Sequence, residues 1–182
     1  GKEKLEQLKE VLEKGFEDLR SMDLIDENDE PTEACMARGI YLDQYQKAFS
    51  HCEVDQQFYC AQLVDSNRWY HIVIERVGEN AYTLNRIHSF QFLGMTIQLH
   101  DFLSAQNPQR EGNPNASSWE PYSDERLLIY YGQRPALTVM TYSYKKCSTA
   151  YLYLDAPSGL YQYDMLEQRI RSVSTEVMEK EV

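Results

Sequence analysis

The stretch of sequence that decides the fold runs from Arg68 to Leu103. It begins with Arg68-Trp-Tyr-His-Ile-Val-Ile-Glu-Arg76, turns at Val77-Gly-Glu-Asn80, continues as Ala81-Tyr-Thr-Leu-Asn-Arg-Ile87, and ends in an apolar run from Ser89 to Leu103. Two alternating segments joined by a Gly/Asn turn predict a β-hairpin. The apolar run is too long and too rich in Leu, Met and Phe for another strand, so it predicts a helix.

The predicted helix is apolar around more than one face. Phe90, Leu93 and Ile97 form one stripe. The second stripe consists of Phe92, Met95, Leu99, Phe102 and Leu103. A helix that is apolar all round is buried on several sides. Either it is central to the fold, or one stripe is a docking surface for a partner protein.

A weaker copy of this strand, turn, strand and helix unit is predicted near the C-terminus. Thr149–Leu154 and Leu160–Tyr163 flank a turn at Ala156–Gly159, and a helix is expected from Asp164 onward. The apolar stripe of that helix would be Leu166, Ile170, Val173 and Val177. The two copies predict two related halves that share one sheet.

Tyrosines gather in the C-terminal strands. Met140, Tyr142 and Tyr144 share one side of the strand Ala136–Lys145, and Tyr151 and Tyr153 share one side of the next strand. If the register agrees, these side chains meet as an aromatic ladder across the two strands. A tyrosine-rich sheet face also suits a protein-binding surface.

The remaining segments predict two N-terminal helices and two further elements. Leu5, Leu8, Leu12, Phe16 and Leu19 place an amphipathic helix over Lys2–Met22. A second helix, about Thr32–Phe49, should pack on the first. Phe58–Leu63 alternates as a strand, and the alternation in Asp124–Tyr131 favours a strand over a helix.

These elements predict an α+β fold with a central antiparallel sheet, an N-terminal helix pair and two hairpin-helix halves related by an approximate internal two-fold. We divide the chain into a helical segment, residues 1–52, and the sheet with its helices, residues 53–182, which together form one compact domain.

Composition excludes several classes of function. The net charge of −11 argues against nucleic acid as a partner, because binding to phosphates needs clustered Lys and Arg. No run approaches the roughly 20 apolar residues that span a bilayer, and the N-terminus lacks a signal-peptide pattern, so a cytoplasmic protein is expected. The four cysteines include no Cys-x-x-Cys pair, which predicts neither a zinc site nor a disulfide framework.

Catalytic motifs are also missing from the sequence. It has no Gly-rich phosphate loop and no His-Glu-x-x-His, and its four histidines are scattered at positions 51, 71, 88 and 100. We therefore expect no catalytic residues, no metal and no cofactor, and interpret the chain as a binding protein rather than an enzyme.

The order of the elements resembles a known family. An N-terminal helical segment, Leu24-Ile-Asp-Glu-Asn-Asp-Glu-Pro-Thr-Glu33, the strand Phe58–Leu63, the hairpin Trp69–Ile87 and a repeated hairpin-helix half are similar to the EspG-like chaperones of type VII (ESX) secretion, in particular the Firmicutes members. The resemblance implies a cytosolic adaptor that binds a helical secreted protein and keeps it soluble for export. It places substrate contacts on the loop after Leu103 and on the helix from Asp164.

The candidate partner-binding residues are the second helical stripe and the tyrosine-rich strands: Phe92, Met95, Leu99, Phe102, Met140, Tyr142, Tyr144, Tyr151 and Tyr153. Two other functions remain open. An immunity protein could use its negative charge against a basic secreted toxin. A small enzyme would need a pocket with convergent polar groups around His71, His88 or His100.

Overall fold

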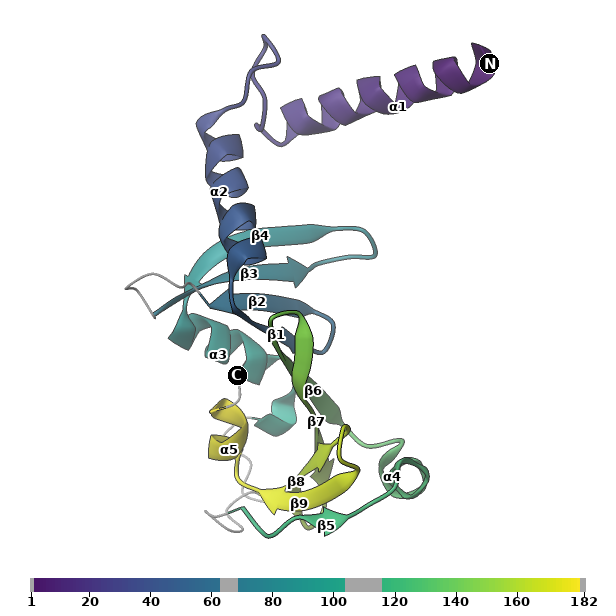
Figure 1. Ribbon diagram of the computed structural model, residues 1–182, viewed down its shortest axis with the longest axis vertical. Coiled ribbons are helices and arrows are strands. Elements are labelled where there is room, and N and C mark those ends of the chain that lie inside the picture. The colour runs from purple at the N-terminus through teal and green to yellow at the C-terminus, as the bar shows by residue number, and fades with distance from the viewer. Residues whose placement is uncertain (1, 63–68, 104–115, 181–182) are drawn as a thin grey trace. The chain divides into compact units, whose positions relative to one another are not determined.

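The computed structural model describes residues 2–62, 69–103 and 116–180 (Figure 1). The chain divides into two compact units, an N-terminal unit, Gly1–Gln46, and a sheet unit, Lys47–Val182. The loop expected after Leu103 lies mostly outside the described residues.

The N-terminal unit contains two helices, α1 (Lys2–Ser21) and α2 (Glu33–Lys47). The acidic segment between them is an ordered turn. Asp26 Oδ1 accepts hydrogen bonds from the backbone N–H groups of Asn28 (2.8 Å) and Glu30 (2.9 Å). These backbone donors hold the pKa of the Asp26 carboxyl below its usual value. Thr32 then begins α2 by accepting a hydrogen bond from the Cys35 N–H at 3.2 Å.

Both predicted N-terminal helices are confirmed, but the prediction that the second packs on the first is wrong. No residue of α2 is buried, and the leucines of α1 are exposed. The physical reason lies in α2, whose apolar residues are interspersed with Arg, Asp and Gln and do not form a broad stripe that could cover α1.

The sheet unit contains nine antiparallel strands in its described residues, in the order β4-β3-β2-β1-β6-β7-β8-β9-β5. The strands are β1 (Ser50–Val54), β2 (Phe58–Gln62), β3 (Tyr70–Arg76), β4 (Tyr82–His88), β5 (Glu120–Pro121), β6 (Ala136–Ser143), β7 (Lys146–Ala156), β8 (Gly159–Asp164) and β9 (Arg169–Val173). The helices are α3 (Ser89–Gln98), the short η1 (Asp101–Leu103), α4 (Asp124–Tyr131) and α5 (Thr175–Glu179). The α+β class with a central antiparallel sheet is confirmed.

Connectivity repeats within this sheet. Strands β1–β4 form a meander followed by α3, and strands β6–β9 form a meander followed by α5. The two meanders meet along the antiparallel pair β1 and β6, where Cys52 lies opposite Thr141. This order is compatible with two related halves, and a rotational two-fold between them stays a prediction.

The hairpin predicted over Arg68–Ile87 is confirmed as β3 and β4, with Tyr70 opposite His88 and Ile74 opposite Leu84. Strand β1 was missed. It is joined to β2 by a tight turn in which Asp55 (φ 51°) and Gln56 (φ 55°) adopt left-handed backbone. Because no glycine marks this turn, no strand was predicted before Phe58, and residues 50–52 were assigned to the N-terminal helical segment.

The prediction of a helix from Asp164 onward is wrong. Asp164 Oδ1 accepts hydrogen bonds from the backbone N–H groups of Leu166 (3.1 Å) and Glu167 (3.2 Å), which closes a turn after β8. The chain then returns as β9, and Ile170 and Val173 are buried in sheet contacts. The second copy therefore continues as a strand where a helix was expected.

The prediction of a strand at Asp124–Tyr131 is also wrong, because this segment is α4. Ser123 accepts a hydrogen bond from the Arg126 N–H at 3.3 Å, and Asp124 and Glu125 occupy the positive end of the helix dipole.

The predicted aromatic ladder does not form. The turn between β6 and β7 lies at Tyr144 (φ 48°) and Lys145 (φ 64°), earlier than expected, so the register differs. Tyr151 lies opposite Val139 and Tyr153 opposite Leu137, whereas Met140 lies opposite Ala150.

Two hydrophobic clusters occupy the sheet unit. The larger one joins Phe92 of α3 and Met178 of α5 to Leu137, Val139 and Tyr153 of the sheet. The smaller one joins Leu154, Tyr163 and Ile170 to residues of α4. Because neighbouring residues of a strand point to opposite faces, Tyr153 and Leu154 show that the clusters lie on opposite faces of the sheet. In Figure 1, α3 and α5 lie on one side of the strands.

Candidate functional site

An exposed group of aromatic side chains lies at the end of the β3–β4 hairpin, where α3 begins. We call it the aromatic patch and define it by Trp69, Tyr70, His88 and Phe90. Tyr70 and His88 form the last pair of the hairpin. The Ser89 N–H donates a hydrogen bond to the Trp69 carbonyl oxygen at 2.8 Å, which ties the start of α3 to the start of β3.

Three rings of the patch are stacked in nearly parallel planes. The His88 ring lies 5.3 Å from Phe90 with a 15° interplanar angle, and 6.1 Å from Trp69 with a 13° angle. Trp69 and Phe90 are 6.3 Å apart. Tyr70 meets His88 edge to face at 5.4 Å. These separations fall in the range of favourable aromatic contacts.

His88 is held in place because it caps α3. The His88 ring atom Nδ1 accepts a hydrogen bond from the backbone N–H of Phe90 at 3.3 Å, and the backbone N–H of His88 donates to Gln91 Oε1 at 3.0 Å. This reciprocal capping fixes the imidazole beside both Trp69 and Phe90. The patch is therefore largely preformed, which lowers the entropy that binding would cost.

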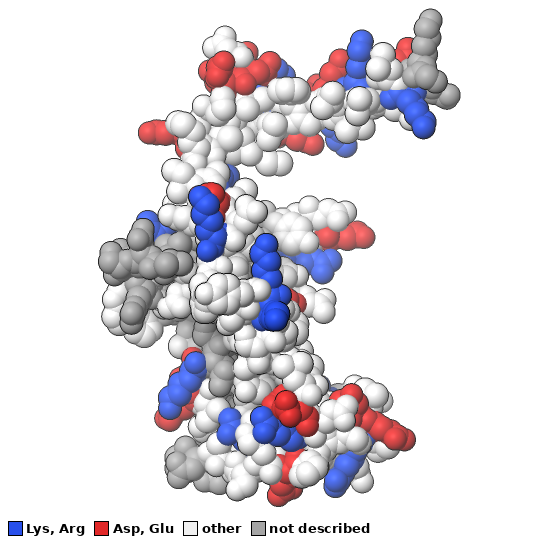
Figure 2. Space-filling model, in the orientation of Figure 1, with Lys and Arg blue, Asp and Glu red and all other residues white. Residues whose placement is uncertain are grey.

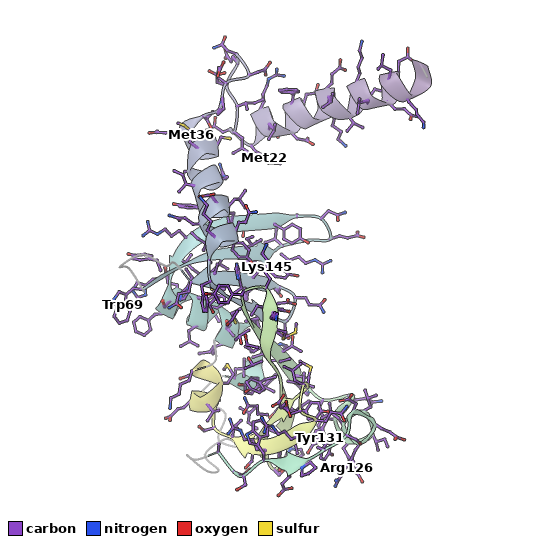
Figure 3. The ribbon with its side chains drawn as sticks, viewed as in Figure 1. Met22, Met36, Trp69, Arg126, Tyr131 and Lys145 are labelled. Carbon is purple, nitrogen blue, oxygen red and sulfur yellow. The ribbon has the colours of Figure 1, made fainter. Side chains whose placement is uncertain are left out.

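The patch exposes an unusual amount of aromatic surface. Trp69 is 58% exposed and Phe90 is 70% exposed. Figure 3 shows Trp69 projecting from the ribbon. Arg86 places its guanidinium 4.7 Å from the Tyr70 ring centre, which adds a cation at the margin. Aromatic residues with Arg beside them are typical of the energetically dominant part of protein interfaces.

A second exposed apolar surface lies on α4. Leu127 and Tyr131 pack on the smaller cluster, while Leu128, Ile129 and Tyr130 are exposed. Phe49 and Tyr144 form a third, smaller group with ring centres 4.4 Å apart. Neither surface has the stacked and capped geometry of the aromatic patch.

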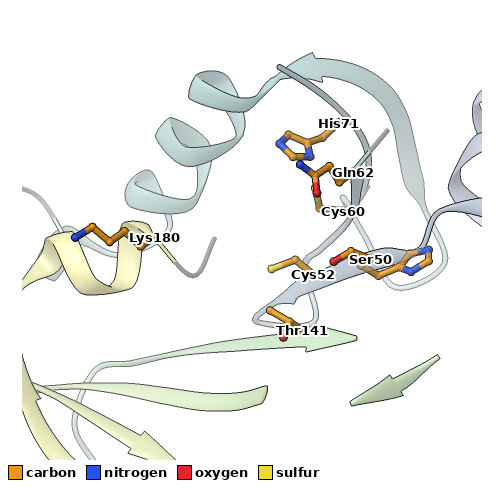
Figure 4. A pocket seen from close by; sticks show the side chains of 8 residues that line it. Ser50, Cys52, Cys60, Gln62, His71, Thr141 and Lys180 are labelled. Atoms are coloured by element: carbon orange, nitrogen blue, oxygen red, sulfur yellow. The ribbon is translucent and has the colours of Figure 1, made fainter. Parts of the chain in front are cut away.

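A pocket of about 210 Å³ lies on the face of the sheet that carries the larger cluster (Figure 4). It is lined by Ser50, His51, Cys52, Cys60, Gln62, His71, Thr141 and Lys180. In Figure 4 the amino group of Lys180 points away from the other lining side chains. Burial raises the pKa of the Cys60 thiol well above its usual value, with a further contribution from Cys52, so Cys60 is not a thiolate near neutral pH.

His71 is a partly buried polar residue of this pocket. Its Nε2 lies 2.8 Å from the Ser89 hydroxyl, and its buried Nδ1 has no hydrogen-bond partner among the described residues. Burial, and secondarily the charge of His88, lower the pKa of His71. A neutral imidazole beside a hydroxyl could act as a base, although no third group orients the ring through Nδ1.

Metal ligands are not clustered in the described part of the chain, where no three His, Cys, Asp or Glu residues are placed to hold an ion. Within the same ranges, no helix combines the length and the apolar character needed to span a bilayer.

The structure disperses the residues predicted to bind a partner. Phe92 and Phe102 are buried in the larger cluster, and Met95 and Leu99 pack against it. The second apolar stripe of the predicted helix therefore packs inside the fold. Tyr153 is buried, and its hydroxyl accepts a hydrogen bond from Gln162 at 2.9 Å. Met140, Tyr142 and Tyr151 are half-buried, and Tyr144 is exposed.

Sequence reasoning missed the aromatic patch. Phe90 belonged to the first stripe of the predicted helix, and Trp69 lay at the edge of the predicted hairpin. Their proximity depends on the pairing of Tyr70 with His88 and on the capping of α3, which periodicity does not reveal. The detectable signal was the number of aromatic residues close to both ends of the hairpin.

Comparison with protein-family models, curated proteins and solved structures finds no match for this chain.

Proposed function

We propose that this protein is a cytoplasmic adaptor of the chaperone type, which binds an amphipathic helix of a secreted partner protein through the aromatic patch and keeps that partner soluble for export. The observation that carries the proposal is the cluster of Trp69, His88 and Phe90, whose ring centres form a triangle and in which Trp69 and Phe90 are exposed. Exposure of a preformed aromatic surface to water is unfavourable in free energy, and such surfaces commonly mark sites that a partner covers.

The dimensions of the patch suit a helical partner. The ring centres of Trp69, His88 and Phe90 are separated by 5.3 to 6.3 Å. Side chains three and four residues apart on a helix have Cβ atoms about 5–6 Å apart. Two or three neighbouring apolar side chains on one face of a partner helix can therefore contact this triangle of rings together, as in helix recognition by a hydrophobic surface.

The test is capture of the partner from a lysate of the native host, with identification by mass spectrometry. The wild-type chain should retain a helical secreted protein. The variant Trp69→Ala/Phe90→Ala should lose it, whereas Tyr144→Ala, which removes a similarly exposed ring elsewhere, should retain it. Equal capture by all three proteins would contradict the proposal.

An immunity function is the first alternative, and the net charge of −11 favours it. Such a protein would bind a basic toxin domain by charge, so its association rate would fall steeply with salt. Recovery of a toxin catalytic domain in the capture experiment would replace the adaptor proposal by this one.

A small enzyme is the second alternative, and the 2.8 Å contact of His71 with Ser89 beside a pocket favours it. A fluorophosphonate probe reacts with serine hydroxyls that a base activates. Labelling at Ser89 that is lost in His71→Gln would support an enzyme. The adaptor proposal predicts no labelling.

A further inference from the structure

The apolar side chains of α1 follow a heptad pattern that no neighbouring helix uses. Counting Leu5 as position a, the pattern continues at Leu8, Leu12, Gly15 and Leu19, and Met22, in the turn directly after α1, keeps the alternating spacing of three and four. This spacing places one seam along a single side of the helix, as in coiled coils. Glu and Lys occupy the outer side, and Figure 2 shows charges of both signs along α1.

The seam is exposed. The apolar side chains from Leu5 to Met22 are between 39% and 69% exposed, and the second helix of the N-terminal unit has no buried residue. Figure 3 marks Met22 at the end of this seam. A helix of this kind gains most of its stability from a partner that covers its apolar side.

The residue order of the seam discriminates between orientations of a second copy. In a parallel pair, Gly15 would face the same glycine of the other copy, which leaves a void, and Lys4 at position g would face Lys9 at position e. In an antiparallel pair centred between residues 13 and 14, the smallest residue, Gly15, faces Leu12, Leu8 faces Leu19, and Leu5 faces Met22. Large side chains then fill the space beside the glycine.

Charges favour the same orientation. In an antiparallel pair, position e of one helix faces position e of the other, and g faces g. At positions e Lys9 faces Phe16, and at positions g Val11 faces Asp18, so no like charges meet beside the seam. Lysine can extend its aliphatic stem over an aromatic ring and keep its ammonium in water.

We infer that α1 pairs with α1 of a second copy of this chain as a short antiparallel coiled coil. Four seam layers, in which Leu8 faces Leu19 and Leu12 faces Gly15, lie within α1, and at each end Leu5 faces Met22, which directly follows the helix. This inference concerns only α1 and is independent of the aromatic patch, so the two can fail separately.

Sedimentation velocity of the full chain over a range of concentrations tests the pairing. The wild type should show a reversible monomer–dimer equilibrium. Leu12→Glu places a carboxylate in the centre of the seam and should weaken the dimer at least about tenfold, because one buried leucine is lost and a charge is added. Gln7→Glu adds the same charge at position c, outside the seam, and should leave the equilibrium unchanged.

Circular dichroism and thermal unfolding should show the same fold for both variants and wild type, since the changed side chains are exposed. A wild-type chain that stays monomeric at every concentration would overturn the inference. So would a dimer that Leu12→Glu does not weaken.

Lysine cross-linking of a mixture of ¹⁴N- and ¹⁵N-labelled protein tests the orientation. In the antiparallel register the two Lys14 residues lie beside each other, whereas the two Lys4 residues are 19 positions apart, about 28 Å along the helix axis. A short reagent should therefore link Lys14 to Lys14 between copies but not Lys4 to Lys4. An intermolecular Lys4–Lys4 link would contradict the antiparallel pair.

Discussion

The side chain of Asp55, in the turn between β1 and β2, forms hydrogen bonds to β6 of the other meander. Its Oδ1 accepts hydrogen bonds from the Thr138 N–H at 2.7 Å and the Thr138 hydroxyl at 3.0 Å, and its Oδ2 lies 2.6 Å from Nε2 of His100. It also occupies a left-handed backbone position, φ 51°, which Asp and Asn tolerate better than other non-glycine residues. The carboxylate thus links the β1–β2 turn to β6 and to the end of the α3 segment.

We predict that Asp55→Ala lowers the free energy of unfolding by about 2–4 kcal/mol, since three charge-assisted contacts and the backbone preference are lost together. Asp55→Asn keeps the shape and the backbone preference and should cost about half as much. Urea denaturation measures both. Equal stability of Asp55→Ala and wild type would show that the contacts do not hold the meanders together.

His71 gives the protein a pH-dependent stability. Burial lowers the pKa of His71 in the folded chain from its ordinary value of 6.5. At a pH between this lowered pKa and about 6.5, His71 is protonated in the unfolded chain and neutral in the folded chain. The contribution of His71 to stability is complete above about pH 6.5 and is lost as the pH falls from 6.5 toward the lower pKa of the folded state.

The measurement is the free energy of unfolding of wild type and His71→Gln from pH 8 to pH 5. We expect the difference between the two proteins to be constant above about pH 6.5 and to shift against the wild type below it. Two curves that stay parallel through this range would show that His71 titrates normally.

Among the single elements, α4 is a helix although its sequence pattern predicts a strand. Leu127, Ile129 and Tyr131 alternate as in a strand, yet Ser123 and two acidic residues mark the start of a helix. The helix is selected by contacts that the sequence does not display. Asp124 accepts a hydrogen bond from the Tyr163 hydroxyl and another from Gln168 Nε2 at 3.0 Å. Burial, together with Asp124, raises the pKa of Tyr163, so this hydroxyl remains a donor.

We predict that Asp124→Ala lowers the free energy of unfolding by about 1–3 kcal/mol, because a buried tyrosine hydroxyl loses its acceptor and α4 loses an N-terminal charge. The matched control is Glu125→Ala, which removes an exposed charge from the same turn and should change stability by less than about 0.5 kcal/mol. Equal effects of the two substitutions would mean that the dipole, and not the contact with Tyr163, fixes α4.

Elements with strong local signals were predictable from sequence. The hairpin β3–β4 has alternation and a Gly/Asn turn, and α1 has a clear apolar stripe. Strand β9 was not predictable, because Ile170 and Val173 also fit helical spacing and the turn before β9 is set by backbone hydrogen bonds to Asp164. Strand β1 was lost for a similar reason, since its turn relies on Asp55 and Gln56 rather than on glycine.

The α+β class and the antiparallel sheet of the whole molecule were predictable, because alternating segments joined by short turns indicate hairpins and separate stretches have helical periodicity. The candidate site did not follow. Phe92 and Phe102 were prominent in the sequence because they are apolar, but Phe92 of α3 and Phe102 of η1 are buried in the larger hydrophobic cluster. Trp69 and Phe90 form a surface only after the hairpin and the helical cap bring them together with His88.

The central claim is that the aromatic patch binds a helical partner. The most direct test is the dissociation constant of the captured partner for purified wild-type protein, Phe90→Ala and Tyr144→Ala, measured by titration calorimetry. We predict at least about tenfold weaker binding by Phe90→Ala, because one exposed ring of an interface centre is removed, and unchanged binding by Tyr144→Ala. Wild-type affinity in Phe90→Ala would contradict it.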